Sequence, residues 1–156
     1  MLPHQRGAGR AGGGLVAFAL AFGAAVAAGE AAREHLALGV ERVVIPGALS
    51  LTLLHNTGIA FSLLRGLPPA VMVVLALTIL GVAVYNKDSW PRTAAVRWGL
   101  GFVLGGAAAN VVERVRFGYV IDYLDVHVWP VFNLADSAIV VGAGLLVLAL
   151  LRGGER

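Results

Sequence analysis

Four long apolar runs alternate with shorter polar segments along this chain of 156 residues. The runs cover residues 11–28, 67–85, 93–112 and 132–151. Each is long enough to cross most of the hydrocarbon core of a bilayer as a helix, which takes about 20 apolar residues. The pattern predicts an all-α membrane fold with four transmembrane helices, and we expect residues 1–156 to form a single domain.

The first run also fits a second interpretation. Arg6 and Arg10 precede it and the small residues AVAAG end it, as in a cleavable signal peptide. A helix over residues 11–28 would be about 27 Å long, which nearly spans the hydrocarbon core. We therefore expect a retained first transmembrane helix.

Between the first two runs the hydrophobic pattern becomes that of strands. In LSLTL, residues 49–53, leucine alternates with a small polar residue, as in a strand with one apolar face. Turn residues at 46–47 and 56–58 divide the region into two or three short strands. Irregular backbone must lie outside the hydrocarbon or be covered by protein. We therefore expect a small extramembrane β-cradle at about residues 40–64.

The third run is rich in small residues, which let neighbouring helices approach closely. They are Gly99, Gly101, Gly105, Gly106, Ala107, Ala108 and Ala109. This helix is expected to lie centrally in the bundle.

Composition agrees with a membrane protein, since 58% of the residues are hydrophobic and only 13% are charged. The net charge of +3 reports orientation rather than a nucleic-acid partner, because basic residues gather before the first run, between the second and third, and after the fourth. The positive-inside rule makes that side cytoplasmic, so both termini are expected in the cytoplasm. The cradle and residues 113–136 are then expected on the outer face. The absence of cysteine excludes disulfides, thiolate metal sites and a cysteine nucleophile.

Two aspartates in apolar surroundings, Asp122 and Asp136, are the strongest candidates for chemistry. Two carboxylates brought close together share a proton, so that one acts as a base on water and the other as an acid. The alternative is that Asp136 only caps a helix and Asp122 is a solvated loop residue. Asp125 lies three residues after Asp122 and would share its face on a helix, so spacing does not choose between them.

Five further polar residues lie beside the apolar runs. Glu113 and Arg114 form either a structural ion pair or a unit in which the guanidinium orients a carboxylate or the substrate. Asn56, Asn110 and Asn133 are either backbone contacts or polar contacts to substrate.

Other catalytic classes fit less well. The histidines show no metal-ligand spacing, and the only lysine, Lys87, falls on the cytoplasmic side, away from Ser62 and Ser137. We expect neither a metal nor a cofactor.

Three ordered motifs carry a resemblance to a known family. NTGIAFSLL at residues 56–64, NVVERVRFGYVIDYLDV at 110–126 and WPVFNLADSAIVVG at 129–142 resemble bacterial lipoprotein signal peptidase, or signal peptidase II. With the four-span plan, the resemblance covers residues 11–151. It implies a multi-pass aspartyl endopeptidase of the cytoplasmic (inner) membrane, with an outer-face β-cradle and a short outer-face helix.

The resemblance also implies a substrate and a site near the extracytoplasmic face. The family removes the signal peptide of diacylglyceryl prolipoproteins just before the lipidated cysteine, among membrane lipids, and globomycin-type inhibitors occupy its site. The motifs make Asp122 and Asp136 the catalytic pair. The matched positions that support the pair or hold substrate are Asn56, Asn110, Glu113, Arg114 and Asn133.

The sequence departs from the family pattern twice. GEAAR, residues 29–33, stands where the family usually has Asp-Gln-x-x-Lys, so the usual aspartate is absent at Gly29 unless Glu30 replaces it. Glu113 stands where the family usually has aspartate. Both departures fall among supporting residues, where small displacements lower rates. They leave open that the chain is a catalytically silent relative that binds lipoprotein or lipid without cutting it. The intramembrane acids leave open a third function, that of a small transporter or proton-path subunit.

Overall fold

A computed structural model of the chain describes residues 8–57 and 93–153. The helices are α1 (Ala8–His35), α3 (Ala94–Phe117) and α4 (Leu134–Gly153), and the strands are β1 (Glu41–Ile45), β2 (Leu49–Asn56) and β3 (Val120–Asp125). Three helices in these residues are long and apolar enough to cross a membrane. The predicted second span, residues 67–85, lies outside the described residues.

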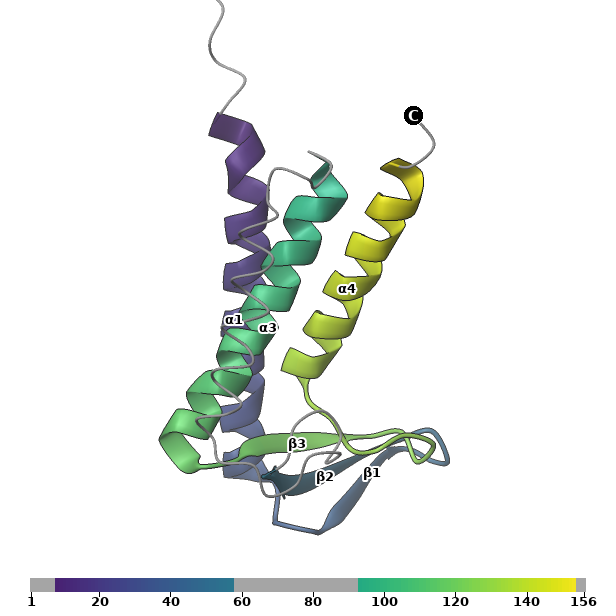
Figure 1. The fold of residues 1–156 in the computed structure, drawn as a ribbon. Coiled ribbons are helices and arrows are strands. Elements are labelled where there is room, and N and C mark those ends of the chain that lie inside the picture. The colour runs from purple at the N-terminus through teal and green to yellow at the C-terminus, as the bar shows by residue number, and fades with distance from the viewer. Residues whose placement is uncertain (1–7, 58–92, 154–156) are drawn as a thin grey trace, which may run out of the picture.

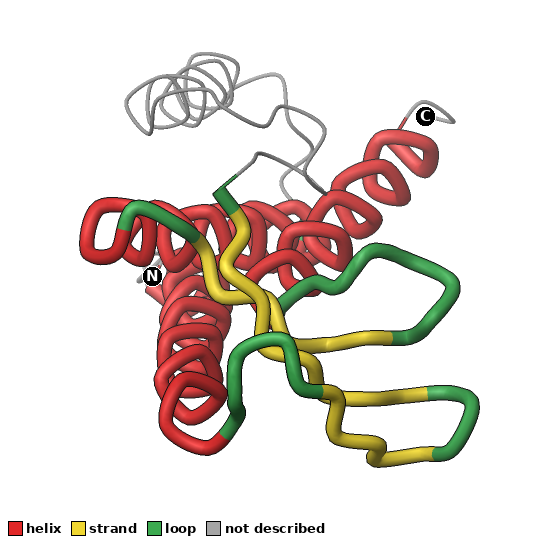
Figure 2. The backbone as a smooth tube through the Cα atoms, turned by 90° about the horizontal axis from the view of Figure 1, so that it is seen from below, coloured by secondary structure: helices red, strands yellow, loops and turns green. Residues whose placement is uncertain are grey.

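The three helices stand side by side, and the sheet lies across one end of them (Figure 1). In the view from below, the strands lie in front of the helix ends and extend beyond them (Figure 2). The sheet is antiparallel in the order β1-β2-β3. A cradle of strands outside the helices is therefore present.

The helix α3 is central because its glycines face two neighbours. A Cβ on Gly101 would collide with the backbone of Gly14 in α1, and one on Gly106 would collide with the backbone of Ala135 in α4. Further along the bundle, one buried alanine from each helix meets in a small core of Ala25, Ala109 and Ala135. The small residues of the third run thus let both neighbouring helices approach closely, as predicted.

Replacing Gly106 by alanine is expected to lower the free energy of unfolding by about 1–3 kcal/mol, because the added methyl group meets backbone that cannot rotate away. Thermal unfolding of the purified protein in detergent measures this. Gly144→Ala in α4 is the matched control, since a Cβ there has nothing within 4 Å. Equal melting temperatures for the two variants would contradict this packing.

Both helices that reach the sheet are longer than the sequence suggested. The first does not end at residue 28 but continues to His35, because Ala32 packs against the sheet residues Leu53, Ile121 and Tyr123. The third does not end at residue 112 but continues to Phe117. There Gly118 adopts a left-handed conformation, with φ of 80°, and ends the helix.

The strand pattern was right for β2 but incomplete for the cradle. Leu53 is buried as expected, packed with Ala32 of α1, whereas the polar residue Ser50 is also buried rather than solvated, because the strand has a bulge between Leu51 and Leu54. The third strand comes from β3, far outside the predicted range of 40–64. Residues 58–64 lie outside the described part of the chain, and no short helix beyond α1, α3 and α4 occurs in residues 8–57 and 93–153.

Candidate active site

Asp122 lies in the middle of β3 with 3% of its surface exposed. It faces Leu54 across the β2–β3 pair, so Asn56 is its diagonal neighbour on the same face. The amide of Asn56 donates to Oδ2 of Asp122 at 2.8 Å, and the amide of Asn133 donates to Oδ1 at 3.0 Å. The interpretation of Asp122 as a solvated loop residue is therefore wrong.

Asp136 lies in the first turn of α4. Its backbone N–H donates to Oδ1 of Asn133 at 2.9 Å, and its own Oδ2 accepts from the backbone N–H of Asn133 at 3.3 Å. This reciprocal pair of hydrogen bonds is a capping box, so Asp136 does cap the helix, but capping is not its only contact. The second oxygen has another partner, because Oδ1 accepts from the amide of Asn110 on α3 at 2.9 Å.

Asn133 joins the two aspartates. Its Nδ2 donates both to Asp122 and to Oδ1 of Asn110, the latter at 3.2 Å, while its Oδ1 caps α4. The side chain is buried, with 4% of its surface exposed. The helix α4 begins at Leu134, two residues later than expected, because the backbone of Phe132 is bonded to Leu124 in β3. Three asparagines therefore hold two carboxylates from different elements in one network.

Burial raises the pKa of Asp122 to about 7, well above its ordinary value, because the charged form is desolvated there. The hydrogen bond from Asn56 opposes this shift, the negative charge of Asp136 adds to it, and the bond from Asn133 and the charge of Arg114 oppose it. The two aspartates thus interact electrostatically as well as through shared amides. A carboxyl group that titrates near neutral pH is suited to proton transfer.

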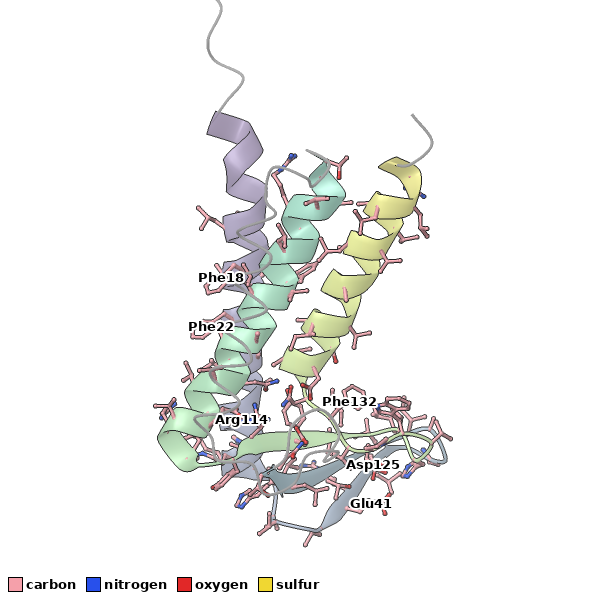
Figure 3. All side chains as sticks on the ribbon, viewed as in Figure 1. Phe18, Phe22, Glu41, Arg114, Asp125 and Phe132 are labelled. Carbon is pink, nitrogen blue, oxygen red and sulfur yellow. The ribbon has the colours of Figure 1, made fainter. Side chains whose placement is uncertain are left out.

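Arg114 and Glu113 are consecutive on α3 but serve different neighbours. Arg114 lies at the end of α3 next to the sheet (Figure 3) and its guanidinium donates to the backbone carbonyl of Asn110 at 3.4 Å. Glu113 accepts the backbone N–H of Ile121 at 2.8 Å through Oε2. No pattern in the sequence indicated this contact between Glu113 and the residue before Asp122.

Asp125 is not part of this network. The prediction that it could share a helical face with Asp122 is wrong, because residues 120–125 form a strand, in which positions three apart point to opposite faces. Asp125 lies near Glu41 in the part of the sheet away from Arg114 (Figure 3). There it belongs to a second polar cluster, in which Ser50 donates to Glu41 at 2.6 Å and contacts His127 at 3.2 Å.

The described ranges contain no group of three or more histidine, aspartate or glutamate residues that could hold a metal ion. His35 contacts the carbonyl of Ala31, and His55 stacks on Tyr119 with ring centroids 3.8 Å apart.

Comparison with known proteins identifies the family. A family model described as signal peptidase II matches residues 17–152. The chain belongs to the signal peptidase II family. The resemblance and the predicted peptidase class are thereby confirmed.

Individual relatives agree with this assignment. The lipoprotein signal peptidase of Pelotomaculum thermopropionicum is 45% identical over 113 residues, which is 72% of this chain and 74% of that protein. The lipoprotein signal peptidase of Enterococcus faecalis is 41% identical over 125 residues, 76% of this chain and 74% of that protein. The family and the three apolar helices together indicate a multi-pass protein of the inner membrane.

Two solved structures of bacterial membrane enzymes share the fold. One, at 2.3 Å resolution, matches with a TM-score of 0.82 and 26% identity over 90% of this chain and 88% of that chain. The other, at 1.9 Å resolution, matches with a TM-score of 0.79 and 26% identity over 90% of this chain and 93% of that chain. The arrangement of helices and sheet is therefore that of known membrane enzymes.

Proposed function

We propose that Asp122 and Asp136 are the catalytic pair with which this signal peptidase II removes the signal peptide of diacylglyceryl-modified prolipoproteins, just before the lipidated cysteine. The relatives named above are lipoprotein signal peptidases. The observation that carries the choice of residues is the buried side chain of Asn133, whose Nδ2 donates to Asp122 and whose Oδ1 accepts from the backbone N–H of Asp136. It ties together two carboxylates from separate elements.

The proposed reaction uses one proton shared by the pair. The ionised carboxylate takes a proton from water, the oxygen of that water attacks the scissile carbonyl carbon, and the protonated carboxyl donates its proton to the carbonyl oxygen. The carboxyl that took the proton from water then gives it to the leaving nitrogen as the C–N bond breaks, and a hydroxyl of the tetrahedral intermediate returns a proton to the other carboxylate. Asn56, Asn110 and Asn133 hold the carboxylates, and Arg114 keeps a positive charge beside them.

The proposed topology puts the site near the extracytoplasmic face and both termini in the cytoplasm. The sheet lies at the ends of α1 and α3 and the beginning of α4 (Figure 1). Arg97 and Arg152 lie toward the opposite ends of α3 and α4, which the positive-inside rule makes cytoplasmic. Residues 67–85 would supply the fourth span of a single domain formed by residues 1–156.

Lipid enters the proposal as part of the substrate. The acyl chains of the prolipoprotein would remain among membrane lipids beside the helices, so that hydrophobic burial contributes to binding and restricts approach to the membrane plane. Globomycin-type inhibitors, which resemble the substrate, would compete for the same site.

Incubation of the purified protein with a diacylglyceryl prolipoprotein tests the proposal. Mass spectrometry should show loss of the signal peptide, with the new N-terminus at the lipidated cysteine and no cleavage when a globomycin-type inhibitor is present. An unchanged substrate mass would support a protein that binds without cutting. Ion flux in proteoliposomes without any peptide product would support a transporter.

The rate of cleavage is expected to fall as the pH rises through about 7, because Asp122 then loses the proton that the pair needs. Stability changes with pH in the same direction: the pKa of Asp122 in the folded protein exceeds the ordinary 3.8, so stability falls as the pH rises from 3.8 to about 7.

In Asn56→Ala the ionised Asp122 carboxylate loses a donor, so the alkaline limb of the rate profile against pH should move up by about one pH unit. Rate profiles against pH measure this, and a limb that stays in place or moves down would contradict it.

A further inference from the structure

The crossing of α1 and α3 next to the site contains a glycine that faces a carboxylate. Gly29 is buried in α1, and a Cβ built on it would lie closer than 3.0 Å to Oε1 of Glu113, a separation that real Cβ atoms essentially never show. The carboxylate of Glu113 therefore occupies the space that a side chain at position 29 would fill. Gly23, six residues earlier on α1, has nothing within 4 Å of such a Cβ.

The other oxygen of Glu113 reaches the strand that carries Asp122. Oε2 accepts the backbone N–H of Ile121 at 2.8 Å. Ile121 has 1% of its surface exposed, so this N–H has no ready access to water. A buried N–H without an acceptor is costly, and the peptide that contains it would move to find one.

The consequence for the site follows from covalent geometry. Ile121 directly precedes Asp122, and Asp122 must meet Asn56 and Asn133 at the same time. A small shift of the Ile121 peptide displaces the Asp122 carboxylate relative to both donors. Misplacement of a reacting group by about 1 Å lowers rates by about 10²-fold.

We propose that Gly29 and Glu113 form a size-matched positioning pair: the missing side chain at Gly29 makes room for the Glu113 carboxylate, which holds the Ile121 amide and thereby places Asp122. This inference rests on the proposed function, because it assigns to Asp122 a position that matters for catalysis. Glu113 acts through Ile121 and is a positioning residue. Its acceptor oxygen is the operative feature, because the hydrogen bond from the Ile121 N–H is what joins Glu113 to the strand that carries Asp122.

The test is a double-mutant cycle on cleavage of the lipidated prolipoprotein. Gly29→Ala and Glu113→Ala are each expected to lower kcat by about 10²-fold with little change in KM. The double variant should be no slower than Glu113→Ala alone, because the added methyl group at 29 then has nothing to displace. Gly23→Ala, the matched control on α1, should keep the full rate.

Glu113→Gln separates positioning from folding and from charge. The glutamine keeps an acceptor oxygen of the same reach, so this variant should retain most of kcat, while Glu113→Ala should not. Additive losses in the cycle, full activity of Gly29→Ala, or a Glu113→Gln variant as slow as Glu113→Ala would each overturn the proposal.

Amide hydrogen exchange at Ile121 provides a readout that does not depend on activity. Exchange should be slow in the wild type and in Glu113→Gln and faster in Gly29→Ala and Glu113→Ala. Unchanged exchange in Gly29→Ala would overturn the pairing even if Asp122 and Asp136 prove catalytic. If Asp122→Asn keeps its activity, the proposed function fails, whereas the exchange result still decides whether Gly29 and Glu113 act together.

Discussion

Asp122→Asn is expected to lower the rate of prolipoprotein cleavage by at least about 10⁴-fold, since an amide neither accepts a proton from water nor shares one with Asp136. The substitution keeps the size of the side chain in a site with 3% exposure, so packing is preserved. The new NH2 group faces the donors of Asn56 or Asn133. Binding of a globomycin-type inhibitor, measured separately, reports whether the site still forms.

Asp136→Asn is expected to have an effect of the same size. The substituted side chain retains one acceptor oxygen at the start of α4, so the capping contact with Asn133 can persist while the shared proton is lost. Asp125→Asn is the matched control for both variants, because Asp125 lies in the same strand but accepts from the backbone of His127 instead. Full turnover by either dyad variant, or loss of turnover in Asp125→Asn, would contradict the assignment.

Asn133→Ser is expected to lower kcat by about 10²–10³-fold while leaving the helix cap in place. Serine is as good an N-cap as asparagine, but its hydroxyl is too short to reach Asp122 and Asn110. The loss in rate follows from removing a buried donor that orients charge in the site. Single-turnover cleavage of the lipidated substrate measures it.

Asn133→Ala separates the two roles of this side chain. It loses the cap as well as the bridge, so it should unfold more easily than Asn133→Ser by about 1 kcal/mol, with a similar rate of cleavage. Thermal unfolding of both variants in the same detergent gives the comparison. A serine variant with the full rate would mean that the bridge to Asp122 does not matter for catalysis.

The positions of α1, α3 and α4 could be predicted from the apolar runs, because insertion of a helix into a bilayer depends on local composition. Their ends were less predictable. The helix α1 continues through polar residues to His35 because Ala32 packs against the sheet, and this contact depends on tertiary packing. The second span and the short outer-face helix stay predictions, as does the orientation of the termini.

The choice between Asp122 and Asp125 shows the limit of what local sequence spacing predicts. The motif match selected Asp122, while the spacing suggested one helical face for both residues. The structure makes the segment a strand, and its twofold alternation sends Asp122 toward Asn56 and Asp125 toward Glu41 and His127.

The sequence by itself therefore determined the membrane class, the strand character of β2 and, through its motifs, the family and the two candidate aspartates. Only the tertiary structure decided which groups meet. Asn56 reaches Asp122 across 66 residues and Asn110 reaches Asp136 across 26. Gly29 and Glu113 come together on different helices, so two separate departures in the sequence became one contact. Such pairings depend on helix crossing and strand register, which are properties of the whole packed chain.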